Sequence, residues 1–305
     1  MNDETPRTFS NVCPQDIVIV VLTLLVLSPM SSASAQSRWE PTGGPTGGTI
    51  YALTELDGTL FTGTYVGGMF KSTDQGESWT RLGVTEVFER VEDFTTNSQG
   101  HLFAGSTYGV RRSMDGGATW ELFTQGLTTR QVSGVAVNAD DVLFVATQGG
   151  GVFRSEDNGE SWMESNNGLT ELSCSEITVG PEGNVYVATQ SGVFASDDNG
   201  DNWTDISSGL TSPSVLEVFV DAGGALWAAT VSGPFKKSDP DSAFERSYHL
   251  NVNVIDTTSM GTLVSGGPVI LRSSDAGDTW TEHPFRFDGI FTTATEIARI
   301  GDRLI

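Results

Sequence analysis

The chain has 305 residues, with 16 lysine or arginine residues against 39 aspartate or glutamate residues and a formal net charge of -23. A surface this acidic repels phosphate backbones and anionic lipid, which argues against nucleic acids and membrane surfaces as partners. Cys13 lies in the export segment described next, so Cys174 has no partner for an internal disulfide. We expect Cys174 to be a core residue rather than a reactive thiol.

Residues 1–35 predict a signal peptide. The apolar run at 17–27 contains Thr23 as its one polar residue, and an Ala-Ser-Ala cleavage sequence follows it at 33–35. Such a run is too short to span a bilayer as a stable helix. We expect a secreted mature chain in the extracellular space, in the periplasm or at the cell surface. The segment before the run is poor in positive charge, so a retained membrane anchor stays open as an alternative.

A motif of the form Ser-x-Asp-x-Gly-x-x-Trp then recurs along the chain. Its aspartates and tryptophans are Asp74 and Trp79, Asp115 and Trp120, Asp157 and Trp162, Asp198 and Trp203, and Asp275 and Trp280. A degenerate copy before the last one has Lys237, Asp239, Asp241 and Phe244 in the four places, and the aromatic residues follow one another at steps of 41, 42, 41, 41 and 36 residues. The Asp can accept backbone N–H groups in a turn, Gly supplies a positive φ, and Trp buries a large apolar surface. These residues are therefore predicted to be structural.

Each unit is predicted to contain four short strands. In the fourth unit they cover 174–179, 184–189, 193–196 and 202–206, with the motif turn before the last. Second strands such as 185–188 are apolar on both faces, so both faces must be covered. Four strands per unit of this length predict an all-β propeller with four-stranded blades.

The motif resembles the Asp-box, also called the bacterial neuraminidase repeat. Propellers with this repeat occur in sialidases, sortilin-type receptors, xyloglucan-specific endoglucanases and photosystem II assembly factors. The resemblance implies the same propeller fold for residues 36–305.

The two ends of this domain predict how the ring closes. The sequence at 39–43 looks like the end of a unit, so we expect it to complete the last blade as its outer strand. Residues 296–300 and 303–305 look like the first two strands of a further unit. We therefore expect six complete repeats and a partial seventh in a seven-bladed ring. The incomplete unit predicts a C-terminally truncated sequence that lacks roughly 15 to 20 residues.

No metal or cofactor is expected. The acidic loop at 197–201 lacks the order of ligands and glycine that a calcium loop requires. The sialidase resemblance would imply three arginines that hold a carboxylate and an Arg-containing motif early in the propeller, but no arginine lies between Trp39 and Asp74. Sialidase activity is therefore not expected.

Two function classes remain. We favour a secreted, non-catalytic recognition module that binds glycan or protein. Loops between the second and third strands, and one shortened connection, provide its candidate ligand-binding residues: Tyr65, Tyr108, Gln148, Gln190 and Tyr248. The alternative is an exported glycoside hydrolase of the sialidase-like or xyloglucanase-like propeller type, which needs two carboxylates. Carboxylates at like positions on first strands are Asp93, Glu176, Glu217 and Glu296, and Glu176 and Glu217 are the candidate catalytic pair.

Overall fold

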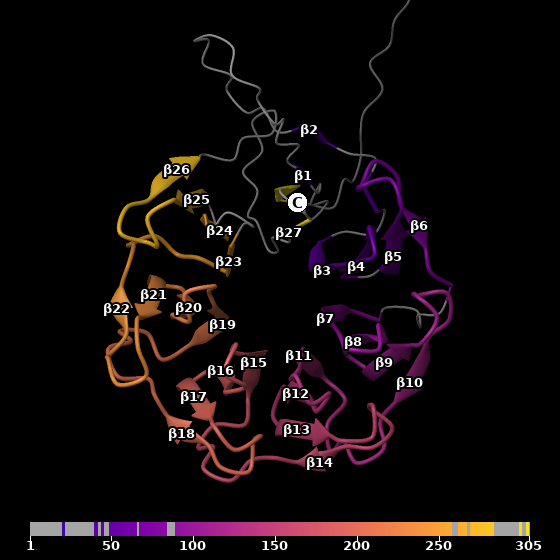
Figure 1. Cartoon of the computed structure of the whole chain (residues 1–305), viewed down its shortest axis with the longest axis horizontal. Coiled ribbons are helices and arrows are strands. Elements are labelled where there is room, and N and C mark those ends of the chain that lie inside the picture. The colour runs from indigo at the N-terminus through magenta and orange to yellow at the C-terminus, as the bar shows by residue number, and fades with distance from the viewer. Residues whose placement is uncertain are drawn as a thin grey trace, which may run out of the picture.

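Six four-stranded antiparallel sheets stand around a central opening in the part of the chain that the structure describes (Figure 1). The structure is a computed structural model that describes residues 20–21, 40–41, 44–45, 49–65, 67–83, 89–257, 262–266, 269–283, 299–300 and 303–304. Each sheet is one sequence unit, and its strands pair in chain order from the opening outward. The all-β propeller of four-stranded blades is therefore confirmed. No helix among the described residues is long and apolar enough to cross a bilayer.

The four strand positions recur from blade to blade. The innermost strands are β3 (Ile50–Leu56), β7 (Val91–Thr96), β11 (Val132–Val137), β15 (Cys174–Val179), β19 (Val215–Val220) and β23 (Val254–Thr257). The second strands are β4 (Thr59–Thr64), β8 (Leu102–Ser106), β12 (Leu143–Thr147), β16 (Val185–Thr189), β20 (Leu226–Thr230) and β24 (Leu263–Gly266). The third strands are β5 (Gly68–Ser72), β9 (Gly109–Ser113), β13 (Gly151–Ser155), β17 (Gly192–Ser196), β21 (Gly233–Lys237) and β25 (Ile270–Ser273). The outermost strands are β6 (Thr80–Arg81), β10 (Glu121–Phe123), β14 (Met163–Glu164), β18 (Thr204–Asp205), β22 (Glu245–Arg246) and β26 (Thr281–His283).

The second and third strands form the core, because each lies between two neighbouring sheets. Every residue of β8, β12 and β20 is buried, which matches their apolar character on both faces. Cys174, at the start of the innermost strand β15, is fully buried in the core between the third and fourth blades, and burial raises the pKa of its thiol to about 12. The thiol therefore stays protonated at neutral pH and packs as an apolar group.

Consecutive blades meet at a backbone contact that admits only glycine. Gly168 follows the outer strand of the third blade with φ of 95°, and a Cβ atom placed on it would lie 2.2 Å from the carbonyl oxygen of Trp203 in the fourth blade. The N–H of Trp203 donates to the carbonyl of Asn167 at 2.8 Å. The same arrangement joins Gly126 to Trp162, with a donated bond to Gln125, and Gly209 to Phe244, with a donated bond to Ser208. The repeated Gly-Leu-Thr sequence is thus explained by contact with the next blade.

A second contact joins the blades through the motif glycines. An aromatic residue near the start of a second strand packs against the motif glycine of the next blade. A Cβ atom added to that glycine would lie within 3.4 Å of the ring in four pairs: Phe61 and Gly117, Phe103 and Gly159, Phe144 and Gly200, and Trp227 and Gly277. The motif therefore shapes the interface between blades as well as its own turn.

The space between the sixth and first blades holds two short strand pairs. Strand β27 (Arg299–Ile300) pairs with β28 (Arg303–Leu304) and lies beside β3 (Figure 1). These strands fall within the segments predicted to begin a further unit. Strand β2 (Glu40–Pro41), in the segment predicted to be an outer strand, pairs with β1 (Val20–Val21), inside the predicted signal peptide. The rest of that signal peptide, its cleavage sequence and Glu296 lie outside the described residues.

We expect Gly168→Ala to destabilise the protein much more than Gly183→Ala. Both glycines have positive φ, but a Cβ atom on Gly183 meets nothing within 4 Å. Gly183→Ala should lower the free energy of unfolding by about 1–2 kcal/mol through backbone strain alone. Gly168→Ala should lower it by about 3–4 kcal/mol, because the methyl group also displaces the Trp203 backbone. Urea denaturation measures both values, and equal losses would show that the glycine contact does not hold the blades together.

Candidate functional site

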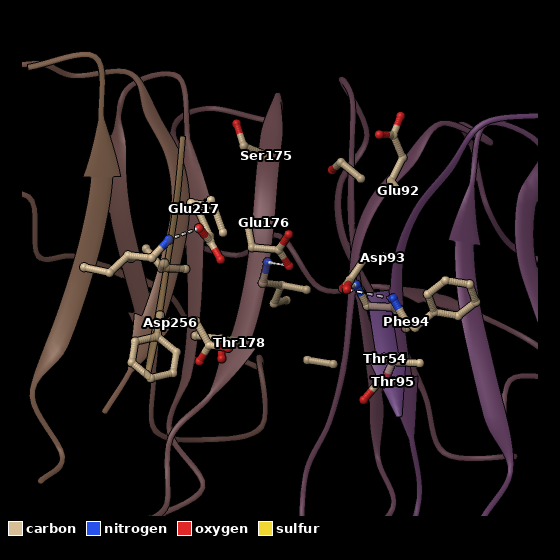
Figure 2. Close-up of a pocket in the computed structure, with 18 of the residues that line it drawn as sticks. Thr54, Glu92, Asp93, Phe94, Thr95, Ser175, Glu176, Thr178, Glu217 and Asp256 are labelled. Atoms are coloured by element: carbon tan, nitrogen blue, oxygen red, sulfur yellow. Dashed lines mark hydrogen bonds between the residues drawn. The ribbon is translucent and has the colours of Figure 1, made fainter. Parts of the chain in front are cut away.

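The innermost strands enclose a channel with a cavity of about 930 Å³. Its wall comes from β3, β7, β11, β15, β19 and β23, and it contains the carboxylates of Glu55, Glu92, Asp93, Glu176, Glu217 and Asp256. No lysine, arginine or histidine occurs among the described residues that line it. Figure 2 shows Asp93, Glu176 and Glu217 at one depth, with Glu92 and Ser175 toward one end and Asp256 and Thr178 toward the other.

A β-bulge on the innermost strand explains why these carboxylates point where they do. The pairing register shifts between Val91 and Asp93, and at the corresponding places before Glu176 and Glu217. A bulge leaves one extra residue out of the ladder and increases the local twist. The unpaired residues are Glu92, Ser175 and Leu216, and the residues that directly follow them, Asp93, Glu176 and Glu217, carry the bulge carboxylates.

The bulge carboxylates bond to backbone N–H groups at the seams between blades. Asp93 accepts from its neighbour Phe94 and from Val135 of the next blade, both at 2.7 Å. Glu217 accepts from Ile255 of the next blade at 2.7 Å (Figure 2). Glu176 accepts from Ile177 at 2.9 Å and lies against Gly134 of the preceding blade, where a Cβ atom would approach its Oε1 to 2.5 Å.

Burial raises the pKa of Asp93 and of Glu217. Each side chain touches the channel, yet protein surrounds it on most sides, and loss of hydration disfavours the charged form. The pKa of Asp93 rises to about 7 from this cause, although bonds from the Val135 and Phe94 N–H groups and from Glu176 oppose it. The pKa of Glu217 is also raised, first by burial and then by repulsion from Asp256 and Asp93. The channel therefore binds protons near neutral pH.

One mouth of the channel carries an aromatic and charged cluster from the first two blades. The Arg90 guanidinium lies 5.2 Å from the ring centre of Tyr51 and 5.9 Å from that of Tyr65, and its Nε bonds to Glu92. Tyr51 and Glu92 also line the channel. Tyr65 is 46% exposed at the turn between β4 and β5. This cluster joins the channel to the loop face and was not found from the sequence, because Tyr51 and Arg90 are 39 positions apart.

The structure brings some of the predicted ligand-binding residues to this loop face. Tyr108 and Gln190 are exposed at the turns between second and third strands. Gln148 is exposed there too, but its amide donates to the carbonyl of Cys174 at 3.0 Å. Tyr248 lies apart from them, because its hydroxyl donates to Glu282 on β26 and its ring packs near Trp280. Tyr248 thus joins the fifth and sixth blades at their outer side.

The motif aspartates lie at the opposite end of each blade and far out from the channel, in the turns between third and fourth strands. In the fourth blade, Asp198 accepts bonds from the backbone and side chain of Asn202 and from the Ser196 hydroxyl. Side-chain hydrogen bonds from the residue four places on lower the pKa of Asp74, Asp115, Asp198 and Asp275 to about 2. These bonds satisfy the carboxylates inside their own turns.

The motif tryptophans lie between the blades. Trp120, Trp162 and Trp203 are buried, and Trp79 and Trp280 are half-buried. The Trp203 indole donates to the Ser165 carbonyl at 2.7 Å, whereas that of Trp162 is buried without a hydrogen-bond partner among the described residues.

A buried ion pair in the second blade was also not predicted from the sequence. Arg111 takes the place that phenylalanine holds in four other third strands, and its Nε bonds to the fully buried Glu89 at 2.8 Å. The pair could have been suspected from an arginine within an apolar pattern. Among the described residues, no group of three or more histidine, cysteine or acidic side chains is arranged to hold a metal ion.

The ring of four-stranded sheets, the Asp-stapled turns and the glycine contacts define an Asp-box β-propeller. Residues 43–227 match the family described as photosynthesis system II assembly factor YCF48. The match covers more than half of the chain, and the protein therefore belongs to this family. No curated protein matches the chain.

Solved structures share the fold at low sequence identity. Virginiamycin B lyase from Staphylococcus aureus is 14% identical with a TM-score of 0.70, over 84% of this chain and 93% of the lyase. YCF48 from Cyanidioschyzon merolae is 15% identical with a TM-score of 0.62, over 84% of this chain and 92% of that one. A further YCF48 structure, bound to D1 peptide, is 15% identical with a TM-score of 0.63, over 78% and 83% of the two chains. The extracellular domain of BT3049 from B. thetaiotaomicron is 15% identical with a TM-score of 0.66. The match covers 75% of this chain but only 34% of the BT3049 chain.

We expect Asp93→Asn to flatten the dependence of stability on pH. The pKa of Asp93 is raised to about 7, so the folded state binds a proton that the unfolded state has lost above about pH 4. The wild-type free energy of unfolding should therefore fall as the pH rises from about 4 to about 7. Asn cannot ionise, and it cannot accept both N–H bonds with one oxygen, so the variant should be less stable than wild type at pH 5 but closer to it at pH 8. Denaturant unfolding at a series of pH values measures the difference in free energy of unfolding between wild type and Asp93→Asn.

Glu182→Gln is the matched control, because Glu182 is exposed in a turn of the fourth blade. Glu182→Gln should leave the dependence of the free energy of unfolding on pH unchanged. A gap between Asp93→Asn and wild type that stays constant from pH 5 to pH 8 would contradict burial of the Asp93 proton.

Proposed function

We propose that this protein is a non-catalytic recognition propeller, and that it binds a polypeptide segment carrying lysine or arginine at the loop-face mouth of the channel. The observation that carries the proposal is the channel itself, which has six carboxylates and no basic side chain among its described lining residues. A cationic side chain entering it is attracted by those carboxylates that are ionised, and its positive charge favours the ionised form of Asp93 and Glu217, whose pKa burial raises.

The cluster at the mouth supplies contacts for the rest of the segment. Tyr65 and Tyr51 offer aromatic surface beside Arg90 and Glu92, which can pair with a backbone or with charged side chains. The YCF48 structure bound to D1 peptide supports a polypeptide ligand, since it has this fold and belongs to the family named by the match. We propose that Tyr108, Gln148 and Gln190 extend the surface around the loop face.

Two further features belong to the proposal. The apolar run at 17–27 and the cleavage sequence at 33–35 support export of the mature chain. The position of β27 and β28 beside β3 supports a ring of seven blades, in which this pair begins the seventh.

We expect a labelled peptide of alternating lysine and serine to bind the protein, and the matching glutamate peptide not to bind. Tyr65→Ala should weaken binding about threefold to tenfold, because it removes an exposed aromatic contact at the mouth. Glu92→Gln should weaken binding and reduce its dependence on salt, because it removes one channel charge. Fluorescence anisotropy at two salt concentrations measures these changes.

Met114→Ala is the matched control, because Met114 is 58% exposed in a motif turn at the opposite end of its blade. It should bind the lysine peptide like wild type. Equal losses in Met114→Ala and Tyr65→Ala, or equal binding of the glutamate peptide, would overturn the proposed site.

A glycoside hydrolase is the second candidate function. It is favoured by the presence of Glu176 and Glu217 at one depth of a shared channel (Figure 2) and by the raised pKa of Glu217, a property that a general acid uses. If the chain hydrolyses a glycan, Glu176→Gln and Glu217→Gln should each abolish turnover of that glycan in a reducing-end assay. Unchanged hydrolysis in both variants would remove these residues from the reaction.

A further inference from the structure

The fifth blade lacks the motif turn because Lys237 replaces the motif serine, Asp241 replaces the motif glycine and Pro240 stands between Asp239 and Asp241. In the five intact motifs, the residue before the motif glycine has a φ between 55° and 65°: Gln75, Gly116, Asn158, Asn199 and Ala276. Pro240 holds this place in the fifth blade, and its ring fixes φ near about -65°. The intact turn therefore cannot form. Instead, Asp239 Oδ1 accepts the N–H groups of Asp241 and Ser242 at 3.0 and 2.7 Å.

The altered turn uncovers an aromatic side chain of the preceding blade. In four other blades the aromatic residue on the second strand packs against the motif glycine of the next blade. Tyr186 on β16 is the corresponding residue of the fourth blade, and the fifth blade has Asp241 where the glycine would stand. A cavity of about 220 Å³ lies beside Tyr186 between these two blades. The cavity thus occurs where the repeat fails to cover its neighbour.

The cavity combines apolar walls with free polar groups. Tyr186, Ile206 and Leu226 supply apolar surface. No hydrogen bond joins the Tyr186 hydroxyl, or Oδ2 of Asp239, to another described residue. In intact motifs the corresponding carboxylate oxygen accepts a bond from the side chain four places on, as Asp275 does from Thr279. Ala243 holds that place in the fifth blade and has no such donor.

The charges at the cavity argue for a neutral ligand. Asp197 and Asp239 are exposed at its rim, while the Lys237 ammonium is buried, donates to the Ser242 carbonyl and lies 5.9 Å from the ring centre of Phe244. The Lys237 ammonium would repel a cationic ligand, and the carboxylates of Asp197 and Asp239 would repel an anionic one. A ligand with many hydroxyl groups uses both kinds of partner without bringing a charge of its own.

We propose that this cavity binds a single neutral sugar ring. A pyranose has C–H faces that pack on tyrosine and aliphatic side chains, and hydroxyl groups that donate to carboxylates and accept from a tyrosine hydroxyl. The cavity volume is below the roughly 300–1,000 Å³ of pockets that bind drug-sized ligands, so the cavity suits a ligand of one ring. The site lies at the motif-turn end of the blades, opposite the loop face, so it does not depend on the polypeptide site proposed above.

The test measures binding of a monosaccharide panel to the full chain by saturation-transfer NMR. The panel contains glucose, galactose, mannose, xylose and N-acetylglucosamine at up to about 50 mM, a range that detects millimolar dissociation constants. We expect at least one sugar to bind. Tyr186→Phe and Asp239→Ala should each weaken its affinity about tenfold, because each removes a hydrogen-bonding group. Asp239→Ala also removes the two bonds that hold the altered turn, so Tyr186→Phe is the stricter test. Asp140→Ala is the matched control, since Asp140 is an exposed acid in a turn at the same end of the third blade.

A second variant tests the link between the cavity and the altered turn. Pro240→Asn combined with Asp241→Gly restores the residue that can adopt positive φ and the motif glycine after it, so we expect the variant to cover Tyr186 and to abolish sugar binding. Circular dichroism confirms that each variant is folded. The proposal is overturned if no sugar in the panel binds, if N-acetyl-arginine amide binds and no sugar does, or if affinity is unchanged in Tyr186→Phe, Asp239→Ala and the restored-motif variant.

Discussion

The propeller depends on a contact between the backbone of one blade and a glycine of the blade before it. Trp203 places its carbonyl oxygen where a side chain on Gly168 would have to stand, and its N–H bonds to the neighbouring carbonyl. The contact uses no side chain from the glycine, and positive φ excludes most other residues from its place. Because the contact recurs at three consecutive seams, at Gly126, Gly168 and Gly209, it sets the distance between the second to fifth blades and accounts for the regular spacing of their aromatic residues.

The same arrangement creates the channel and its chemistry. Holding the blades side by side brings the bulged innermost strands together, and the carboxylates that follow the bulges then lie between neighbouring strands. Asp93 and Glu217 use that position to accept N–H groups across blade boundaries. Their bonds stabilise the inner rim, and their burial raises their pKa. The structural role and the proposed ligand-binding role therefore fall on one set of side chains, and protonation affects both.

In this repeat protein, the places that differ from the repeat carry the candidate sites. The first two blades have Tyr51, Tyr65 and Arg90 together at the channel mouth. The fifth blade has Pro240 where the motif turn needs a positive φ, and a cavity opens beside Tyr186. The intact motifs, by contrast, satisfy their aspartates within their own turns. A unit that keeps the pattern supports the ring, and a unit that departs from it exposes groups to a ligand.

The sequence alone determined the strands, the turns and the propeller class, because these follow from spacing within one unit. The strands predicted at 174–179 and 184–189 agree with Cys174–Val179 and Val185–Thr189 to within one residue. It also identified Tyr65 and the first-strand carboxylates as candidates. Only the tertiary structure decided that Tyr248 packs against the sixth blade, that Arg90 lies over two tyrosines, and that Tyr186 borders a cavity. These contacts join residues that are tens of positions apart, and the direction of each side chain depends on how adjacent blades meet, which no local spacing records.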